Sequence, residues 1–255
     1  MRMEGTNNEY EAFQSFLRVG LEPQYVHINE LKKGHNSLED FSAIFLPGGF
    51  SAGDYIRAGV IFASRIGHSS YDDLKNFVDS GKPIVGICNG FQVLSELGFL
   101  PGWNLTNQRE IVLGQNTSNR YECRYTYIRL TSRNPIFAKY LEQGKRYLIP
   151  VAHSEGKVQI QNKDENLERL LSNDQILFRY CDDEGNFDSY PWNPNGSDYS
   201  IAAISNKAGN VIGLMPHPER LFYNYRNVDK LSRGREAIGE LFFRSIRDYI
   251  IEKGF

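Results

Sequence analysis

The chain has 255 residues, 40% of them hydrophobic, which predicts one domain or one enlarged domain with a sizeable core. Its formal net charge of -2 argues against a protein that binds nucleic acid or an acidic surface. The sequence has no apolar run that could span a bilayer, no signal-peptide pattern and three scattered cysteines, so we expect a soluble cytoplasmic protein without disulfide bonds.

The first third of the chain alternates predicted helices with predicted strands. Such alternation is typical of βαβ units, whose parallel strands place ligand sites at their carboxyl ends. We therefore expect an α/β fold with a parallel sheet. The predicted elements are a helix capped by Asn7 or Asn8 and ended by Gly20, strands over 25–28 and 43–46, a glycine-rich loop over 47–54, and a helix over 71–78.

The stretch 83–92 joins a short apolar strand to a helix through Gly-x-Cys-x-Gly. Glycine at 86 and 90 tolerates the backbone crowding of a sharp strand-to-helix turn, and the turn pushes Cys88 out into solvent with strained geometry. The positive end of the following helix favours a reactive thiolate. A lone cysteine is more often a small core residue, but a core residue needs no flanking glycines. The pattern therefore predicts a cysteine nucleophile.

The residues from about 105 to 190 contain predicted strands with few helices between them. We expect them to continue the sheet and to add an antiparallel extension. A hairpin follows, and its second strand leads directly into Pro216-His217-Pro218-Glu219. The predicted elements are strands over 126–130, 146–149 and 175–178, the hairpin strands over 201–204 and 211–215, and a last helix over 232–253.

Two His-x-Glu pairs could serve the cysteine. A cysteine nucleophile needs a base, and a carboxylate two residues on in an extended segment can orient the imidazole. His217 and Glu219 lie in a segment stiffened by two prolines, and His153 and Glu155 have the same spacing. An isolated pair of this kind is more often an ordinary surface feature, and spacing alone does not choose between the two.

The motifs together resemble a known family. The elbow over 86–92 (GICNGFQ), with the distant 216–219 (PHPE), resembles the class I, or triad, glutamine amidotransferases. Within that family, one subgroup is matched along nearly the whole chain: the glutaminase subunits of phosphoribosylformylglycinamidine synthase, an enzyme of purine biosynthesis. The matching stretches are 5–9 (GTNNE), 48–55 (GGFSAGDY), 193–197 (NPNGS) and 213–220 (GLMPHPER).

The resemblance implies a flavodoxin-like α/β fold in a single domain over 1–255, with a mostly parallel central sheet, helices on both faces and an antiparallel extension. It implies that Cys88 attacks the side-chain amide of L-glutamine and forms a thioester. His217 would be the general acid and base, and Glu219 would orient it. The choice between the two His-x-Glu pairs thus follows from the resemblance.

The resemblance also implies how the substrate is bound and where the ammonia goes. The backbone N–H groups of Gly49 and Asn89 would hold the oxyanion, and Gln92 would line the glutamine pocket. Ammonia would pass to a large synthetase subunit, present alone or with a small accessory subunit. ATP and Mg²⁺ are expected on that partner, with no cofactor or metal on this chain, which has no Gly-x-x-x-x-Gly-Lys-Ser/Thr loop.

Three departures from the family pattern stand out. The family begins with a hydrophobic strand, whereas only three residues precede Glu4 here, so either the start lies upstream or a first strand is truncated. Ser154 replaces a usual glycine, which leaves the role of His153 in the pocket or in partner contacts open. The segment 107–121 is longer than usual, and we expect an exposed insertion.

Two other classes of protein compete with this interpretation. One is a stand-alone cysteine hydrolase or peptidase on the same fold, against which Gln92 and the Gly48-Gly49 motif argue. The other is a non-catalytic binding module, against which the intact set of Cys88, His217 and Glu219 argues.

Overall fold

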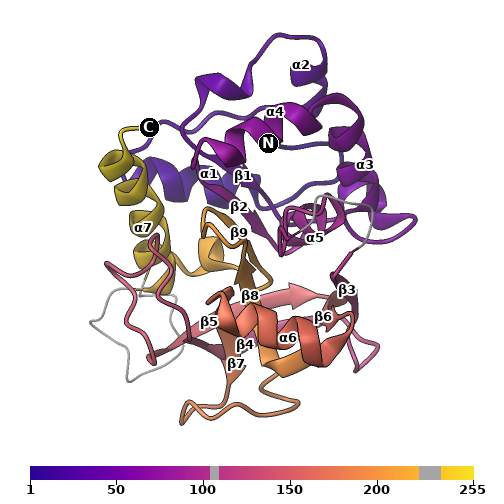
Figure 1. The fold of residues 1–255 in the computed structure, drawn as a ribbon, viewed down its shortest axis with the longest axis vertical. Coiled ribbons are helices and arrows are strands. Elements are labelled where there is room, and N and C mark those ends of the chain that lie inside the picture. Colours follow the sequence, from indigo (N-terminus) through magenta and orange to yellow (C-terminus); the bar gives the residue numbers. More distant parts are fainter. Residues whose placement is uncertain (104–108, 224–236) are drawn as a thin grey trace.

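The computed structural model describes residues 1–103, 109–223 and 237–255, which form an α/β fold (Figure 1). The helices are α1 Glu9–Arg18, α2 Ile28–Lys32, α3 Val60–Ser69, α4 Tyr71–Asp79, α5 Asn89–Glu96, α6 Lys163–Ser172 and α7 Ile238–Lys253. The strands are β1 Ile44–Leu46, β2 Ile84–Ile87, β3 Ile111–Gln115, β4 Glu122–Leu130, β5 Arg146–His153, β6 Glu155–Ile160, β7 Ile176–Cys181, β8 Ile201–Ser205 and β9 Val211–Leu214.

The larger sheet has a parallel half and an antiparallel half. Its strand order is β1-β2-β9-β8-β7-β4-β5, and β3 pairs with β6 in a separate small sheet. β1, β2 and β9 are parallel to one another, whereas each later neighbouring pair is antiparallel. The predicted hairpin, β8–β9, and the antiparallel extension are therefore confirmed.

Helices cover both faces of the parallel half, as predicted. Successive side chains of a strand point to opposite faces. The ring of Phe45 in β1 lies 5.4 Å from that of Phe16 in α1 and 6.2 Å from that of Phe243 in α7. The next residue, Leu46, packs against Gly90 at the start of α5. α1 and α7 thus lie on one face and α5 on the other.

The sheet curls, and this brings its antiparallel end back to the parallel strands. β5 is the strand farthest from β1 in the strand order. Nevertheless, His217, which follows β9, donates its backbone N–H to the carbonyl of Pro150 in β5 at 2.9 Å. The last residues of β5 therefore lie near the carboxyl ends of β2 and β9, where the candidate site is found.

The prediction of a strand over residues 25–28 is wrong. His27 makes one isolated bridge with Arg2, and Ile28 already begins α2. A β-prone stretch becomes a strand only beside a partner, and this one has a single bridged residue. Beside it the sheet ends at β1, next to a largely apolar cavity of about 400 Å³ between α1, β1 and the end of α7.

The exposed insertion predicted over 107–121 is also corrected. Residues 109–121 include β3, which pairs with β6 and buries Ile111 and Leu113. Alternating apolar residues give β3 one buried face. Residues 107 and 108 lie outside the described residues, as does the predicted start of the last helix at Ser232; α7 begins at Ile238.

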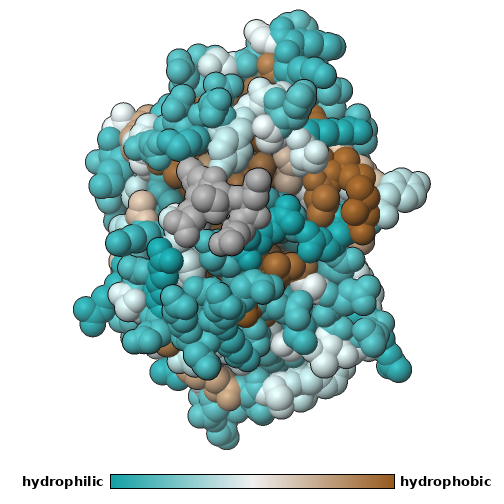
Figure 2. Space-filling model, turned by 45° about the vertical axis from the view of Figure 1, so that its right-hand side comes forward, coloured by the Kyte–Doolittle hydropathy of each residue, from teal (hydrophilic) through white to brown (hydrophobic). Residues whose placement is uncertain are grey.

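The face of the molecule in Figure 2 is mainly hydrophilic, and its hydrophobic residues form small groups. In the described part of the chain, none of the helices combines the length and the apolar character that crossing a bilayer requires.

Candidate active site

Cys88 occupies the sharp turn between β2 and α5. It has φ 52° and ψ -105°, a strained backbone conformation for a residue with a side chain. A Cβ on Gly86 would lie 2.4 Å from the carbonyl oxygen of Gly90, and one on Gly90 would lie 2.1 Å from that of Leu46. The flanking glycines therefore allow a close approach of backbone that no other residue permits, as the sequence predicted.

Cys88 does not point out into solvent, however. It is only 6% exposed, and a Cβ on Gly48 would lie 3.3 Å from its own Cβ. The glycine-rich loop after β1 thus closes over the turn. The Cys88 thiol faces the carbonyl oxygen of Ala152 at the end of β5, with 3.7 Å between Sγ and O. The nucleophile sits inside a small cavity, because the curled sheet brings β5 across it.

We predict that Gly90→Ala destabilises the protein by about 1–3 kcal/mol, the range for overpacking of a closely packed interior. The reason is the 2.1 Å separation between the added Cβ and Leu46 O, which only a backbone shift can relieve. Urea unfolding measures the change. Gly67→Ala in α3 is the matched control, since its Cβ would meet only Leu97 at an ordinary 3.5 Å; an equal loss in both variants would contradict the explanation.

His217 and Glu219 form a buried, hydrogen-bonded pair. His217 Nδ1 lies 2.6 Å from Glu219 Oε1, and the two residues are 1% and 3% exposed. Burial disfavours the charged imidazole, but the carboxylate of Glu219 and the nearby Cys88 outweigh it and raise the pKa of His217. The carboxylate fixes the hydrogen on Nδ1, which leaves Nε2 to exchange protons with the site.

The competing pair, His153 and Glu155, is not joined. His153 ends β5 and Glu155 begins β6, so the chain turns between them. His153 Nδ1 lies 3.1 Å from Asn116 Oδ1, whereas Glu155 Oε2 accepts the backbone N–H of Ala58 at 3.2 Å. Both side chains nevertheless line the cavity that contains Cys88.

The two predicted oxyanion donors lie on either side of Cys88. Gly49 lines the cavity with φ 127°, and Asn89 is the first residue of α5, so its N–H has no intrahelical partner. The Asn89 side chain accepts the hydroxyl of Ser51 at 2.6 Å and thereby ties the glycine-rich loop to the helix. This hydrogen bond therefore fixes the glycine-rich loop relative to the start of α5.

Gln92, which was predicted to line the glutamine pocket, lines the cavity that contains Cys88 and also supports its wall. Its Nε2 donates to the carbonyl oxygen of Glu155 at 2.5 Å, and its Oε1 accepts from Asn89 Nδ2 at 3.2 Å. Gln92 thus connects the start of α5 to the turn between β5 and β6.

An acidic part of the cavity was not predicted from the sequence. Asp54, the last residue of the glycine-rich loop, lines it together with Glu155, and Asn89 Nδ2 donates to Asp54 Oδ1 at 3.3 Å. Burial and the nearby carboxylate of Glu155 raise the pKa of Asp54 to about 6. The position of Asp54 at the end of the glycine-rich loop that follows a predicted strand was the available signal.

Asn8 was predicted only as a helix cap. It is the residue before α1, but its side chain makes no capping bond. Its Nδ2 instead lies 3.3 Å from His217 Nδ1, and its Oδ1 accepts from the guanidinium of Arg220 at 2.9 Å. Asn8 therefore lies beside the His217–Glu219 pair on the cavity side and is held there by Arg220.

The motif over 193–197 supports the site indirectly. Asn195 is fully buried, and its Nδ2 donates to the carbonyl oxygen of Gly156 at 2.8 Å. The hydroxyl of Ser197 accepts the backbone N–H of Val158 at 2.9 Å. The motif thus holds β6, whose first residues form one wall of the cavity.

A thiol on a strained elbow, with an imidazole held by a carboxylate beside it, suits attack on a carbonyl group and transfer of the acyl group to sulfur. In the described residues, no group of three or more His, Cys, Asp or Glu side chains could hold a metal ion. Fold and site define the class of triad-type cysteine amidotransferases and hydrolases.

Comparisons with known proteins place the chain within that class. A family model described as a CobB/CobQ-like glutamine amidotransferase domain matches residues 1–250. The chain is 51% identical over 245 residues to phosphoribosylformylglycinamidine synthase subunit PurQ of Picrophilus torridus, covering 96% of this chain and 94% of the relative. It is 47% identical over 264 residues to the subunit of the same name from Archaeoglobus fulgidus, covering 98% and 95%.

A solved structure agrees. The structure of PurLQS from Thermotoga maritima matches with a TM-score of 0.73 and 32% identity, covering 98% of this chain and 96% of that one. The chain belongs to the PurQ family of glutamine amidotransferases, the glutaminase subunits of phosphoribosylformylglycinamidine synthase. The resemblance inferred from the sequence is thereby confirmed.

Proposed function

We propose that this chain hydrolyses L-glutamine to glutamate and ammonia and supplies the ammonia to the large synthetase subunit of phosphoribosylformylglycinamidine synthase. The observation that carries the proposal is the buried thiol of Cys88 in the same cavity as the His217–Glu219 pair. The relatives that are subunits of phosphoribosylformylglycinamidine synthase, and the PurLQS structure of Thermotoga maritima, support a synthetase partner together with an accessory subunit. ATP and Mg²⁺ would be bound by the synthetase.

In the first step, the sulfur of Cys88 bonds to the side-chain carbonyl carbon of glutamine. His217 takes the thiol proton and gives it to the amide nitrogen as the C–N bond breaks, so that ammonia leaves and a thioester remains. The negative oxygen that forms in between is held by the backbone N–H groups of Gly49 and Asn89. Glu219 keeps the ring oriented throughout.

In the second step, water attacks the thioester carbon. His217 removes a proton from the water, the C–S bond breaks, and the proton returns to sulfur as glutamate leaves. One thiol and one imidazole are regenerated, so the cycle consumes only glutamine and water. The three cysteines are free, which suits a reducing compartment, and we propose that this cycle operates in the cytoplasm.

Asp54 and Glu155 are suited to hold the α-ammonium group of glutamine, since both carboxylates line the cavity. The pKa of Asp54 is raised to about 6, so its negative charge is present above that pH and is lost as the pH falls through it. We therefore predict that kcat/KM for glutamine declines about 3- to 10-fold between roughly pH 7.5 and 5.5 through this group.

Asp54→Asn tests this prediction. The variant should have a lower kcat/KM at neutral pH and should lose this part of the pH dependence, which steady-state kinetics across the pH range would measure. Asp73→Asn, at an exposed position of α4, is the control and should keep the wild-type profile. Superimposable profiles for wild type and Asp54→Asn would refute a role for this carboxylate.

The rival classes are separated by substrate. Glutamate release from glutamine, measured with the synthetase present, supports the amidotransferase, and cleavage of peptides in place of glutamine supports a stand-alone peptidase. A glutamine analogue that alkylates thiols should label Cys88, and absence of both labelling and turnover would favour a binding module.

A further inference from the structure

His153 is a buried side chain that the mechanism above does not use. It is 3% exposed and lines the same cavity as Cys88 and His217. Its Nδ1 faces Asn116 Oδ1, but its Nε2 has no hydrogen-bond partner among the residues that the structure describes. Leaving a buried polar atom unpaired is costly, so its place in the wall of a substrate cavity points to a ligand atom as the partner.

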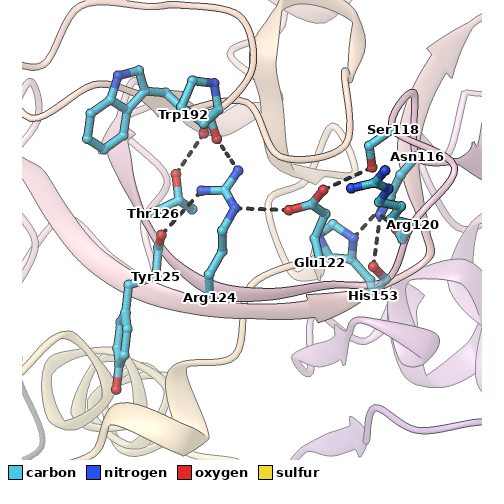
Figure 3. Close-up of polar contacts among 10 residues, drawn as sticks. Asn116, Ser118, Arg120, Glu122, Arg124, Tyr125, Thr126, His153 and Trp192 are labelled. Carbon is cyan, nitrogen blue, oxygen red and sulfur yellow. Dashed lines mark hydrogen bonds and ion pairs between the residues drawn. The ribbon is translucent and has the colours of Figure 1, made fainter.

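Asn116 determines which nitrogen of His153 carries the hydrogen. Its Nδ2 donates to the carbonyl oxygens of Arg120 at 2.9 Å and of His153 at 2.8 Å. Figure 3 shows this amide directed at the His153 ring. Because both amide hydrogens are used on carbonyls, Oδ1 must be the atom that faces the ring, and Nδ1 must donate to it. Nε2 therefore presents a lone pair.

The surroundings of Asn116 are firmly held. Glu122, which pairs with His153 across β4 and β5, accepts from Ser118 Oγ and from Arg124 Nε, both at 2.9 Å. Arg124 in turn donates to the carbonyl of Pro191. These bonds connect the turn that carries Asn116 to two further segments of the chain, so the ring of His153 is fixed in one orientation.

The ring is also kept neutral. Burial and the neighbouring His217 lower the pKa of His153 to about 3. At neutral pH the Nε2 atom is thus an acceptor, which can receive an N–H or O–H group but cannot donate. Any ligand group that contacts it must bring its own hydrogen.

We propose that Nε2 of His153 accepts a hydrogen bond from the side-chain amide N–H of glutamine and thereby orients the amide for attack by Cys88. The inference rests on the proposed glutaminase function. The other donor of glutamine, its α-ammonium group, is charged and is better matched by the carboxylates of Asp54 and Glu155 in the same cavity. The amide N–H is the donor that remains for a neutral acceptor.

This contact gives the site a preference for amides. The side-chain carboxylate of glutamate has no hydrogen to offer and would set its lone pairs against that of Nε2, so the product is bound less well than the substrate. A site built to accept a hydrogen bond rejects an analogue that lacks the donor, because the buried acceptor is then left unpaired.

The test compares two substrates that differ only in the leaving group, which carries N–H donors in one and none in the other. L-glutamine and the γ-methyl ester of L-glutamate both acylate the cysteine and both release glutamate, but the ester has no N–H at the leaving group. Wild type, His153→Leu and His153→Gln are assayed as the full chain with the synthetase present, and Cys88→Ala gives the background. His153→Gln retains an acceptor oxygen of similar reach.

We expect His153→Leu to lower kcat/KM for glutamine about 10- to 100-fold, the range for loss of a buried hydrogen-bond partner, and to change kcat/KM for the ester less than about 3-fold. His153→Gln should recover part of the loss. Equal losses on both substrates would show a structural role only, and unchanged glutamine turnover in His153→Leu would show no role; either result overturns the proposal. Failure of the glutaminase function itself would appear already in the wild type.

Discussion

Replacing Cys88 with alanine is expected to abolish glutamine-dependent synthesis by the complete enzyme while ammonia-dependent synthesis continues. The thiol forms the bond to the substrate carbon, so its removal should lower the glutamine-dependent rate by more than about 10³-fold. Substrate binding and the oxyanion donors alone do not replace the nucleophile. The synthetase needs only ammonia, which can be added to the medium. The measurement is product formation by the reconstituted complex with glutamine or with an ammonium salt.

Cys123 provides the matched control. It is a free cysteine that lies exposed on β4, so Cys123→Ala changes the same atoms outside the cavity. This variant should keep both activities. If Cys88→Ala retained glutamine use, or if it lost both activities while the complex remained folded, Cys88 would not be the nucleophile.

The elbow could be predicted from the sequence because its constraints are local. Gly86, Cys88 and Gly90 are close in the chain, and the crowding that selects glycine arises where one strand turns at once into a helix. What local reasoning could not give is the environment of the thiol. The loop at Gly48 and the end of β5 cover it, and both arrive from far away in the sequence, so Cys88 is buried where an exposed residue was expected.

The difference between local and long-range constraints also explains why the sequence pattern could not choose between His153 and His217. His153 and His217 have identical spacing to a glutamate, so the sequence pattern treats them alike. The structure separates them through the backbone that follows each one. After His217 a short helical turn keeps Glu219 within 2.6 Å, whereas after His153 the chain turns into β6 and carries Glu155 away. The resemblance to a family chose the pair that the structure joins, which spacing could not do.

The failed strand over 25–28 shows the limit of propensity. Its residue types favour extended structure, but a strand also requires a neighbour along its length, and Arg2 provides one bridge only. β3 illustrates the opposite case. Part of a segment interpreted as a surface insertion becomes ordered because β6, more than forty residues later, offers an edge to pair with.

Replacing His217 with alanine should lower glutamine turnover by at least about 10²-fold, the lower range for acid–base catalysis. Without the imidazole, the thiol has no base and the departing nitrogen has no acid, so kcat should fall. Both the amide and the ester substrate should be affected, since each requires activation of sulfur. Steady-state kinetics of the folded complex with both substrates measure this effect.

Variants of His153 and His217 should differ in their effects on the amide and the ester substrate. His153→Ala should impair the amide and spare the ester, because its Nε2 has no partner among the described residues and its Nδ1 is committed to Asn116. His35→Ala, at an exposed position between α2 and β1, should alter neither. Glu219→Gln keeps the shape of the side chain but removes the charge that raises the pKa of His217. Turnover of both substrates should therefore fall, by a smaller factor than in His217→Ala. A larger loss from His153→Ala than from His217→Ala, on folded protein, would reverse the assignment of the general base.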